Sequence, residues 1–151
     1  MRRVLACLAC ISLLLGAIVN CSTLAQAMDK EEFMNKINAL MNSQPQDPDA
    51  LIDLGNEGLA KWAGDDAEYQ SLAYTSMAFG YSWQGKNELA IKEIDRALKL
   101  SPPLTAFILK AYILKGQNQI EDAFNVCMEG ASHFKASEAE SICRSEFSLL
   151  K

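Results

Sequence analysis

The sequence predicts an all-α protein with about seven helices. Valine is scarce, no stretch alternates apolar and polar residues for long, and proline or glycine interrupts the chain at regular intervals. Half of the residues are apolar, so a core can form. We expect helices near residues 29–43, 47–63, 66–84, 87–100, 103–116, 119–134 and 137–149.

The N-terminal segment, residues 1–27, has the order of a secretory signal peptide. A basic start is followed by an uncharged apolar run, residues 4–19, and then by the small residues Ala25 and Ala27, after which a peptidase would cut. Sixteen apolar residues are short for a membrane span, which needs roughly 20. We therefore expect export, a periplasmic location in a bacterium, and one domain over residues 28–151.

A second way of processing this segment stays open. The residues Ile18 to Cys21 resemble a bacterial lipobox, in which Cys21 would be acylated and become the new N-terminus. Asn20 departs from that pattern, which has Gly, Ala or Ser before the cysteine. In this alternative the protein is an outer-membrane lipoprotein.

The charge of the chain narrows the class of partner. The formal net charge is -5, and loss of residues 1–27 would remove two of the 14 basic side chains and none of the 19 acidic ones. The mature charge would be -7. Nucleic acids select for basic faces, so we expect no nucleic-acid partner.

Local signals justify the helix boundaries in order. Pro48 suits the first turn of the second helix, because its missing N–H would have no intrahelical partner there. Gly64, Gly85 and Gly116 are expected to end the second, third and fifth helices. The pair 102–103 is Pro-Pro and stops the fourth helix.

Each helix carries one apolar stripe at steps of three and four residues. The terminal helices are expected to close the two ends of the array. In the first helix the stripe is Phe33, Ile37, Leu40 and Met41, and in the last it is Ile142, Cys143 and Phe147.

The third and fourth helices resemble a tetratricopeptide repeat over residues 71–104. That family's 34-residue pattern has aromatic and small residues on a first helix, a turn glycine, two alanines around a large apolar residue on a second helix, and a final proline. The matching residues here are Tyr74, Met77, Ala78, Tyr81, Gly85, Ala90, Ile94, Ala97 and Pro102. The resemblance implies antiparallel helical hairpins stacked as a short solenoid.

The neighbouring segments resemble the repeat less closely. Upstream, Leu51, Leu54 and Gly55 stand at first-helix places, but Gly58 replaces the expected tyrosine. Downstream the matches are Ile108, Tyr112 and Gly116, and Ala123 then comes two residues late, which predicts a longer turn.

The resemblance also implies a partner-binding groove lined by the first helix of each pair. The residues at those places are Ile52, Asn56, Thr75, Phe79, Ser82, Trp83, Lys110 and Ile113. They do not match the Lys/Arg/Asn clamp with which one subset of the family grips a C-terminal carboxylate. A mainly apolar groove suits an amphipathic helix or an extended apolar peptide. The alternative is that Phe79 and Trp83 simply pack on a neighbouring helix.

Two cysteines remain after the expected cleavage, Cys127 and Cys143. Each lies on the apolar stripe of its helix, and the two are equally far from the turn expected near residue 135. Antiparallel packing would bring the sulfurs together, and exported proteins meet oxidising conditions, so we expect a disulfide. Two free core thiols are the alternative, and a thiol–disulfide protein is a rival from another functional class.

No catalytic centre is evident in the sequence. His133 is the sole histidine, and its place near a helix C-terminus suits a favourable interaction with the helix dipole. We expect no cofactor and no metal. The sequence thus predicts a non-enzymatic adaptor that binds another protein and aids assembly or positioning of an envelope complex, with membrane contact only if Cys21 is acylated.

Overall fold

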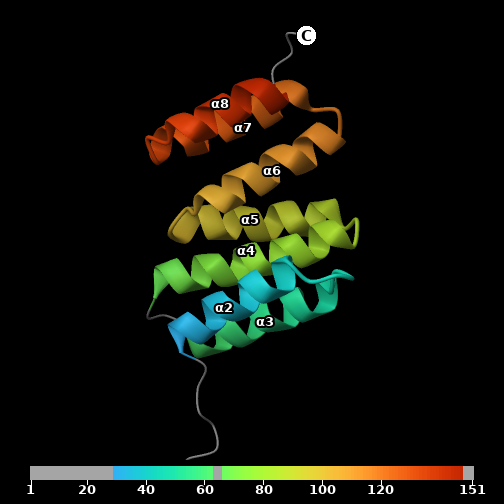
Figure 1. Cartoon of the computed structure of the whole chain (residues 1–151), viewed down its shortest axis with the longest axis vertical. Coiled ribbons are helices and arrows are strands. Elements are labelled where there is room, and N and C mark those ends of the chain that lie inside the picture. The colour runs from blue at the N-terminus through green and yellow to red at the C-terminus, as the bar shows by residue number, and fades with distance from the viewer. Residues whose placement is uncertain (1–28, 63–65, 148–151) are drawn as a thin grey trace, which may run out of the picture.

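A computed structural model describes residues 29–62 and 66–147 of the chain (Figure 1). Within these residues the protein has seven helices and no strand, which confirms the predicted all-α class. The predicted signal peptide and Cys21 lie outside the described residues. The helices are α2 (Lys30–Met41), α3 (Pro48–Lys61), α4 (Ala67–Trp83), α5 (Asn87–Leu100), α6 (Leu104–Gly116), α7 (Ile120–His133) and α8 (Ser137–Phe147).

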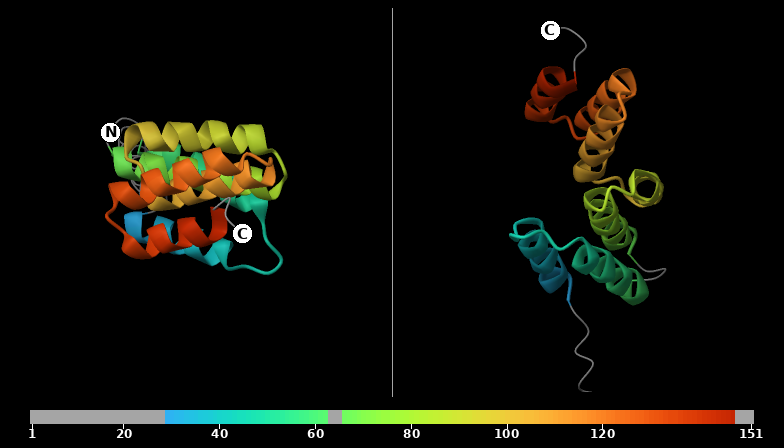
Figure 2. Two further views of the ribbon diagram at one scale, coloured as in Figure 1. Left: turned by 90° about the horizontal axis from the view of Figure 1, so that it is seen from above. Right: turned by 90° about the vertical axis from the view of Figure 1, so that its right-hand side faces the viewer.

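The helices form two curved layers. Seen along the helix axes, α2, α4, α6 and α8 make an inner layer, and α3, α5 and α7 make an outer layer (Figure 2). Each helix packs against its neighbour in sequence, and α4 also contacts α6 within the inner layer. The stack is therefore a short helical array that curves towards its inner layer.

The array repeats at a fixed step along the sequence, which we call the repeat interval. It is the step from Asn87, where α5 begins, to Ile120, where α7 begins, and it also separates the ends of these two helices. The same interval separates the last residues of α4 and α6 and the first residues of α6 and α8. The pairs α4–α5 and α6–α7 are thus two copies of one hairpin. α8 takes the place of the first helix of a third copy.

Three turns share one geometry. After α4, Gly85 has φ +73°, and the N–H of Lys86 donates to the carbonyl of Tyr81 at 2.9 Å, which closes the helix end. Asn118 (φ 64°) and Lys135 (φ 50°) occupy the same left-handed position after α6 and α7. The prediction of a longer turn after Gly116 is wrong, because Asn118 takes the place of Gly85 and both turns have three residues.

Small residues let α3 and α4 approach closely. A Cβ added at Gly55 would lie 2.3 Å from Met77 Cγ, and one at Gly80 would lie 2.5 Å from the carbonyl oxygen of Pro48. Gly58 stands where the repeat pattern has a tyrosine. A Cβ added at Gly58 would lie 2.9 Å from the ring of Phe33. These glycines serve packing, and each of these positions would clash with a larger residue.

The layer of α3 corrects one prediction. The sequence placed α3 as the first helix of a degenerate repeat, whereas it lies in the outer layer with α5 and α7 (Figure 2). By alternation it is the second helix of a hairpin that begins with α2. The turn between α2 and α3 is longer than those after α4 and α6, which obscures the equivalence in sequence.

Each terminal helix packs on the array through a few buried apolar residues. Phe33 of α2 is fully buried and packs edge-on against Trp62, with ring centroids 4.8 Å apart. In α8 the buried apolar residues are Ala139, Cys143 and Phe147, whereas Ile142 is 46% exposed. The expectation that Ile142 belongs to the buried stripe is wrong, since Ala139 supplies the preceding turn of that stripe.

Candidate protein-interaction face

Aromatic side chains bridge neighbouring helices on the concave face, by which we mean the exposed side of α2, α4, α6 and α8. Phe79 of α4 packs against a core cluster that includes Leu109 and Ile113 of α6. Tyr112 of α6 lies edge-on against Phe147 of α8, with ring centroids 5.1 Å apart. Aromatic residues thus link α4 to α6 and α6 to α8.

Phe79 and Trp83, two of the predicted groove residues, lie close together on α4. Their ring centroids are 6.4 Å apart with an interplanar angle of 59°, and both side chains are half-buried. Each therefore presents part of its ring to solvent while the rest packs on the fold.

Tyr112 was not among the predicted groove residues, although it is 47% exposed. It lies one repeat interval after Phe79 and so occupies the equivalent place on α6. Ile108, half-buried, is likewise equivalent to Thr75. The same interval separates Ala78 from Ala111, and this spacing of core alanines was the signal that could have identified both residues.

Two of the predicted groove residues are buried. The Thr75 hydroxyl donates to the carbonyl of Ser71 at 2.8 Å, and Ile113 belongs to the core cluster between α4, α5 and α6. Ser82 is half-buried beside Trp83. The accessible part of the predicted groove on α4 therefore consists of Phe79, Ser82 and Trp83.

Lys110 lies away from the aromatic residues. Its Nζ is 2.7 Å from Oδ1 of Asp95 on α5, so the side chain reaches towards the outer layer. The equivalent position, one repeat interval later, is Cys143, which links α8 to α7. Lys110 and Cys143 thus make equivalent cross-links between an inner helix and the outer helix before it.

Ile52 and Asn56 are not brought to the concave face. Both lie on α3 in the outer layer (Figure 2). Ile52 packs on α4, since a Cβ added at Gly80 would lie only 2.7 Å from Ile52 Cγ1. Asn56 is exposed. The assignment of α3 to the wrong layer explains why the sequence placed them in the groove.

The disulfide predicted between Cys127 and Cys143 is present. It joins α7 to α8 with the two Cα atoms 5.6 Å apart, and both residues are only 1% exposed. Reactive thiols need exposure, so this bond has the surroundings of a structural cross-link.

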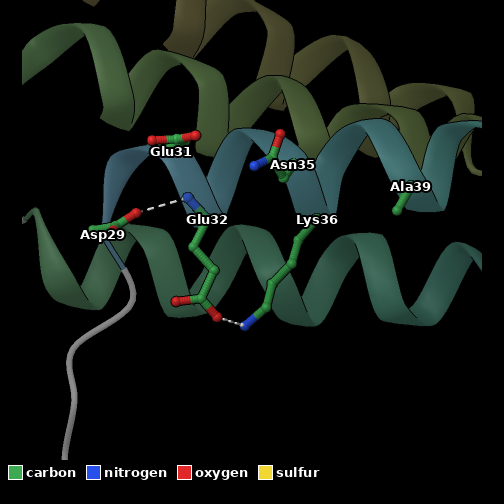
Figure 3. Close-up of a pocket in the computed structure, with 6 residues that line it drawn as sticks. All are labelled: Asp29, Glu31, Glu32, Asn35, Lys36 and Ala39. Atoms are coloured by element: carbon green, nitrogen blue, oxygen red, sulfur yellow. Dashed lines mark hydrogen bonds and ion pairs between the residues drawn. The ribbon is translucent and has the colours of Figure 1, made fainter.

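The outward side of α2 carries a shallow hollow of about 440 Å³, lined mostly by charged and polar residues (Figure 3). Glu31 and Asn35 lie on its upper edge, on the side of α4, whereas Glu32 and Lys36 pair below at 2.8 Å. Asp29 caps the helix by accepting from the N–H of Glu32 at 2.7 Å. These interactions account for Asp29, Glu32 and Lys36 without a ligand.

An ion pair between Lys30 and Asp66 fastens α2 to the start of α4. The hydrogen bond from Lys30 lowers the pKa of the Asp66 carboxyl, and the same bond raises the pKa of Lys30. Lys30 Nζ also lies 4.4 Å from the ring centroid of Tyr69. These contacts hold the start of α2 against the start of α4.

Other chemistry is limited in the described part of the chain. Residues 29–62 and 66–147 contain no group of three or more His, Cys, Asp or Glu side chains that could hold a metal ion. His133 lies at the end of α7, as predicted, and it is exposed. None of the helices in these two ranges is both long and apolar enough to span a bilayer.

Comparison with known proteins assigns no relative. No family model matches the chain, and neither a curated protein nor a solved structure matches it.

Proposed function

We propose that this protein is an exported tetratricopeptide-type adaptor that binds another protein through the concave face and has no enzymatic activity. The partner supplies an apolar peptide or the apolar side of a helix. Such binding would help to assemble or position a complex of the periplasm or cell envelope. No cofactor and no metal take part.

The observation that carries the proposal is the row of partly exposed aromatic residues on successive inner helices. Phe79 and Trp83 lie on α4, and Tyr112 lies on α6. These two helices are the first helices of successive copies of the hairpin. Aromatic side chains supply much of the binding energy at protein interfaces, because they bury large areas with few rotatable bonds. Their place on a curved helical array fits the resemblance to the repeat family.

The test uses the variants Phe79→Ala and Trp83→Ala in a pull-down from the native envelope fraction, together with thermal unfolding. We expect strong loss of partner capture, since buried aromatic anchors commonly cost more than about 2 kcal/mol of binding when truncated. The loss of folding stability should be smaller than the roughly 3–5 kcal/mol typical of a core aromatic.

Leu100→Ala is the matched control, because Leu100 is an exposed apolar residue on the outer helix α5. It should leave both capture and stability nearly unchanged. Severe destabilisation by Phe79→Ala and Trp83→Ala, with normal capture by the protein that stays folded, would assign these rings to the core and contradict the proposal.

Two alternatives remain distinct from this proposal. An outer-membrane lipoprotein acylated at Cys21 would have the same binding face but a different anchor. A thiol–disulfide protein would need Cys127 or Cys143 to meet a substrate, and their burial supports a structural bond instead. A thiol reagent tests the thiol–disulfide alternative. Labelling of Cys127 or Cys143 in the folded protein after mild reduction would support that alternative, and absence of labelling would support the adaptor.

A further inference from the structure

A second, separate pocket lies at the opposite end of α4 from Trp83. This edge pocket has a volume of about 340 Å³ and lies between the start of α4, the turn from α5 to α6, and the end of α7. Its lining residues are Glu68, Leu72, Ser101, Pro102, Pro103, Leu104, Thr105 and Phe134. A volume of this size is at the lower end of the range for ligand sites, roughly 300–1,000 Å³, and it can take one large side chain.

Most of the wall is apolar and rigidly placed. Leu72 packs on the core beneath α2 and α4, and Leu104 packs on the core beneath α6 and α7. Pro102 and Pro103 have fixed backbone φ angles, which gives the wall between these helices a preset shape. Phe134, which follows α7, is 44% exposed although it is a large aromatic residue.

Glu68 supplies a carboxylate at the wall of the edge pocket. It is exposed, and the described residues give it no hydrogen-bonded or ion-paired partner, since the nearby Lys30 is paired with Asp66. A peptide cation beside the pocket would meet this carboxylate without displacing an existing ion pair.

The charge of the surrounding helices favours the same sign of ligand. Residues 29–83 contain ten acidic and three basic side chains, whereas residues 84–147 contain nine acidic and eight basic ones. The net charge is therefore -7 (3 minus 10) over residues 29–83, which supply Glu68 and Leu72 to the pocket wall, and -1 (8 minus 9) over residues 84–147, which supply the rest of the wall. Lys135 follows Phe134 but does not line the pocket.

We propose that the edge pocket binds a large apolar side chain of a partner peptide in which Lys or Arg stands beside that side chain. The apolar group fills the space between Leu72, Pro103 and Phe134, and the cation pairs with Glu68. This inference rests on the proposed adaptor function and adds a specificity site remote from Phe79 and Trp83.

The experiment measures binding of three synthetic peptide pools to the purified protein by fluorescence anisotropy. One pool has a central Leu, Phe or Trp flanked by Lys or Arg, one has the same centre flanked by Asp or Glu, and one has a central Ser flanked by Lys or Arg. We expect the apolar–basic pool to bind most tightly. Phe134→Ser should weaken it about tenfold, the loss common for one anchoring side chain, and Glu68→Lys should reverse the charge preference.

Leu89→Ser is the matched control, because Leu89 is 41% exposed and lies near the start of α5, outside the edge pocket. It should bind all three pools as the unchanged protein does. Circular dichroism of each variant verifies that the helices are intact.

Three results would overturn the edge pocket. They are absence of binding by the apolar–basic pool, equal binding of the acidic pool, and unchanged binding after Phe134→Ser and Glu68→Lys. If the pools bind in a way that depends on Phe79 and Trp83 alone, the edge pocket is refuted while the proposed function of the concave face stands.

Discussion

Left-handed backbone geometry at three single residues ends three of the helices. Gly85 adopts it at no steric cost, because it has no Cβ, and Asn118 tolerates it better than most residues. Lys135 has neither advantage. The three turns therefore carry different amounts of local strain although their hydrogen bonding is the same.

Lys135→Gly should stabilise the protein by roughly 0.5–1 kcal/mol, since relief of left-handed strain exceeds the extra entropy of glycine in the unfolded chain. Asn118→Gly should have a smaller effect. Urea unfolding at constant pH measures both. Gly85→Ala is the reverse control and should destabilise, and a destabilised Lys135→Gly would show that the turn after α7 has no such strain.

At this scale the sequence predicted residues whose role depends on their immediate neighbours. Cys127 and Cys143 were paired correctly because both the apolar stripe and the turn are local features. Tyr112 was missed because Gly116, a plausible turn residue, set the register two residues too early. An asparagine in the left-handed position looks like any polar residue until the hydrogen bonds around it are known.

The disulfide fastens α8, the last helix described. Cys127→Ala with Cys143→Ala should lower stability by roughly 3 kcal/mol in the chain-entropy model for a loop of this length, in which the cysteines are 16 residues apart. Amide exchange should rise across α8 and remain unchanged in α4 and α5. Peptide mapping without reduction should show the linked pair, and alkylation of both thiols in exported protein would disprove the bond.

The attachment of α2 should depend on pH through Lys30 and Asp66. Because the pKa of Asp66 lies below 3.8 in the folded protein, the stabilisation is complete above that value and is lost as the pH falls through the lowered pKa. Because the pKa of Lys30 lies above 10.5, the contribution is also lost as the pH rises through that raised value.

The measurement compares Lys30→Met with the unchanged protein by urea unfolding at a series of pH values. The difference in unfolding midpoint should be present near neutral pH and vanish at strongly acidic pH. Lys92→Met, at an exposed site on α5, is the control and should show no such trend. A difference that persists at acidic pH would mean that packing of the Lys30 stem, rather than its charge, holds α2.

Helix positions were predictable because proline and glycine break the chain at local sequence signals. The layer to which α3 belongs was not predictable in the same way. It depends on the number of helices that alternate along the stack, and α2 has too few repeat residues to be counted as one of them. The close packing of Gly55 and Gly80 against α4 and α3 depends on tertiary contact, which the repeat pattern does not describe.

For the whole molecule, export is a separate prediction. The Ala25-Gln26-Ala27 pattern predicts that the mature chain begins at Met28. The intact mass of the protein from its native host should equal that of residues 28–151 with the disulfide formed. A diacylglyceryl adduct on Cys21 would instead place the protein in the outer membrane.

The equivalent links made by Lys110 and Cys143 give the stack unequal joints. The pair of Lys110 with Asp95 crosses the seam between α5 and α6, and it can separate and re-form as salt and solvent compete for it. The covalent bond from Cys143 to Cys127 crosses the seam between α7 and α8 and does not open under the same conditions. Bending of the array should therefore be taken up by a hinge between α5 and α6, while α6, α7 and α8 move as one rigid block that carries Tyr112 with it.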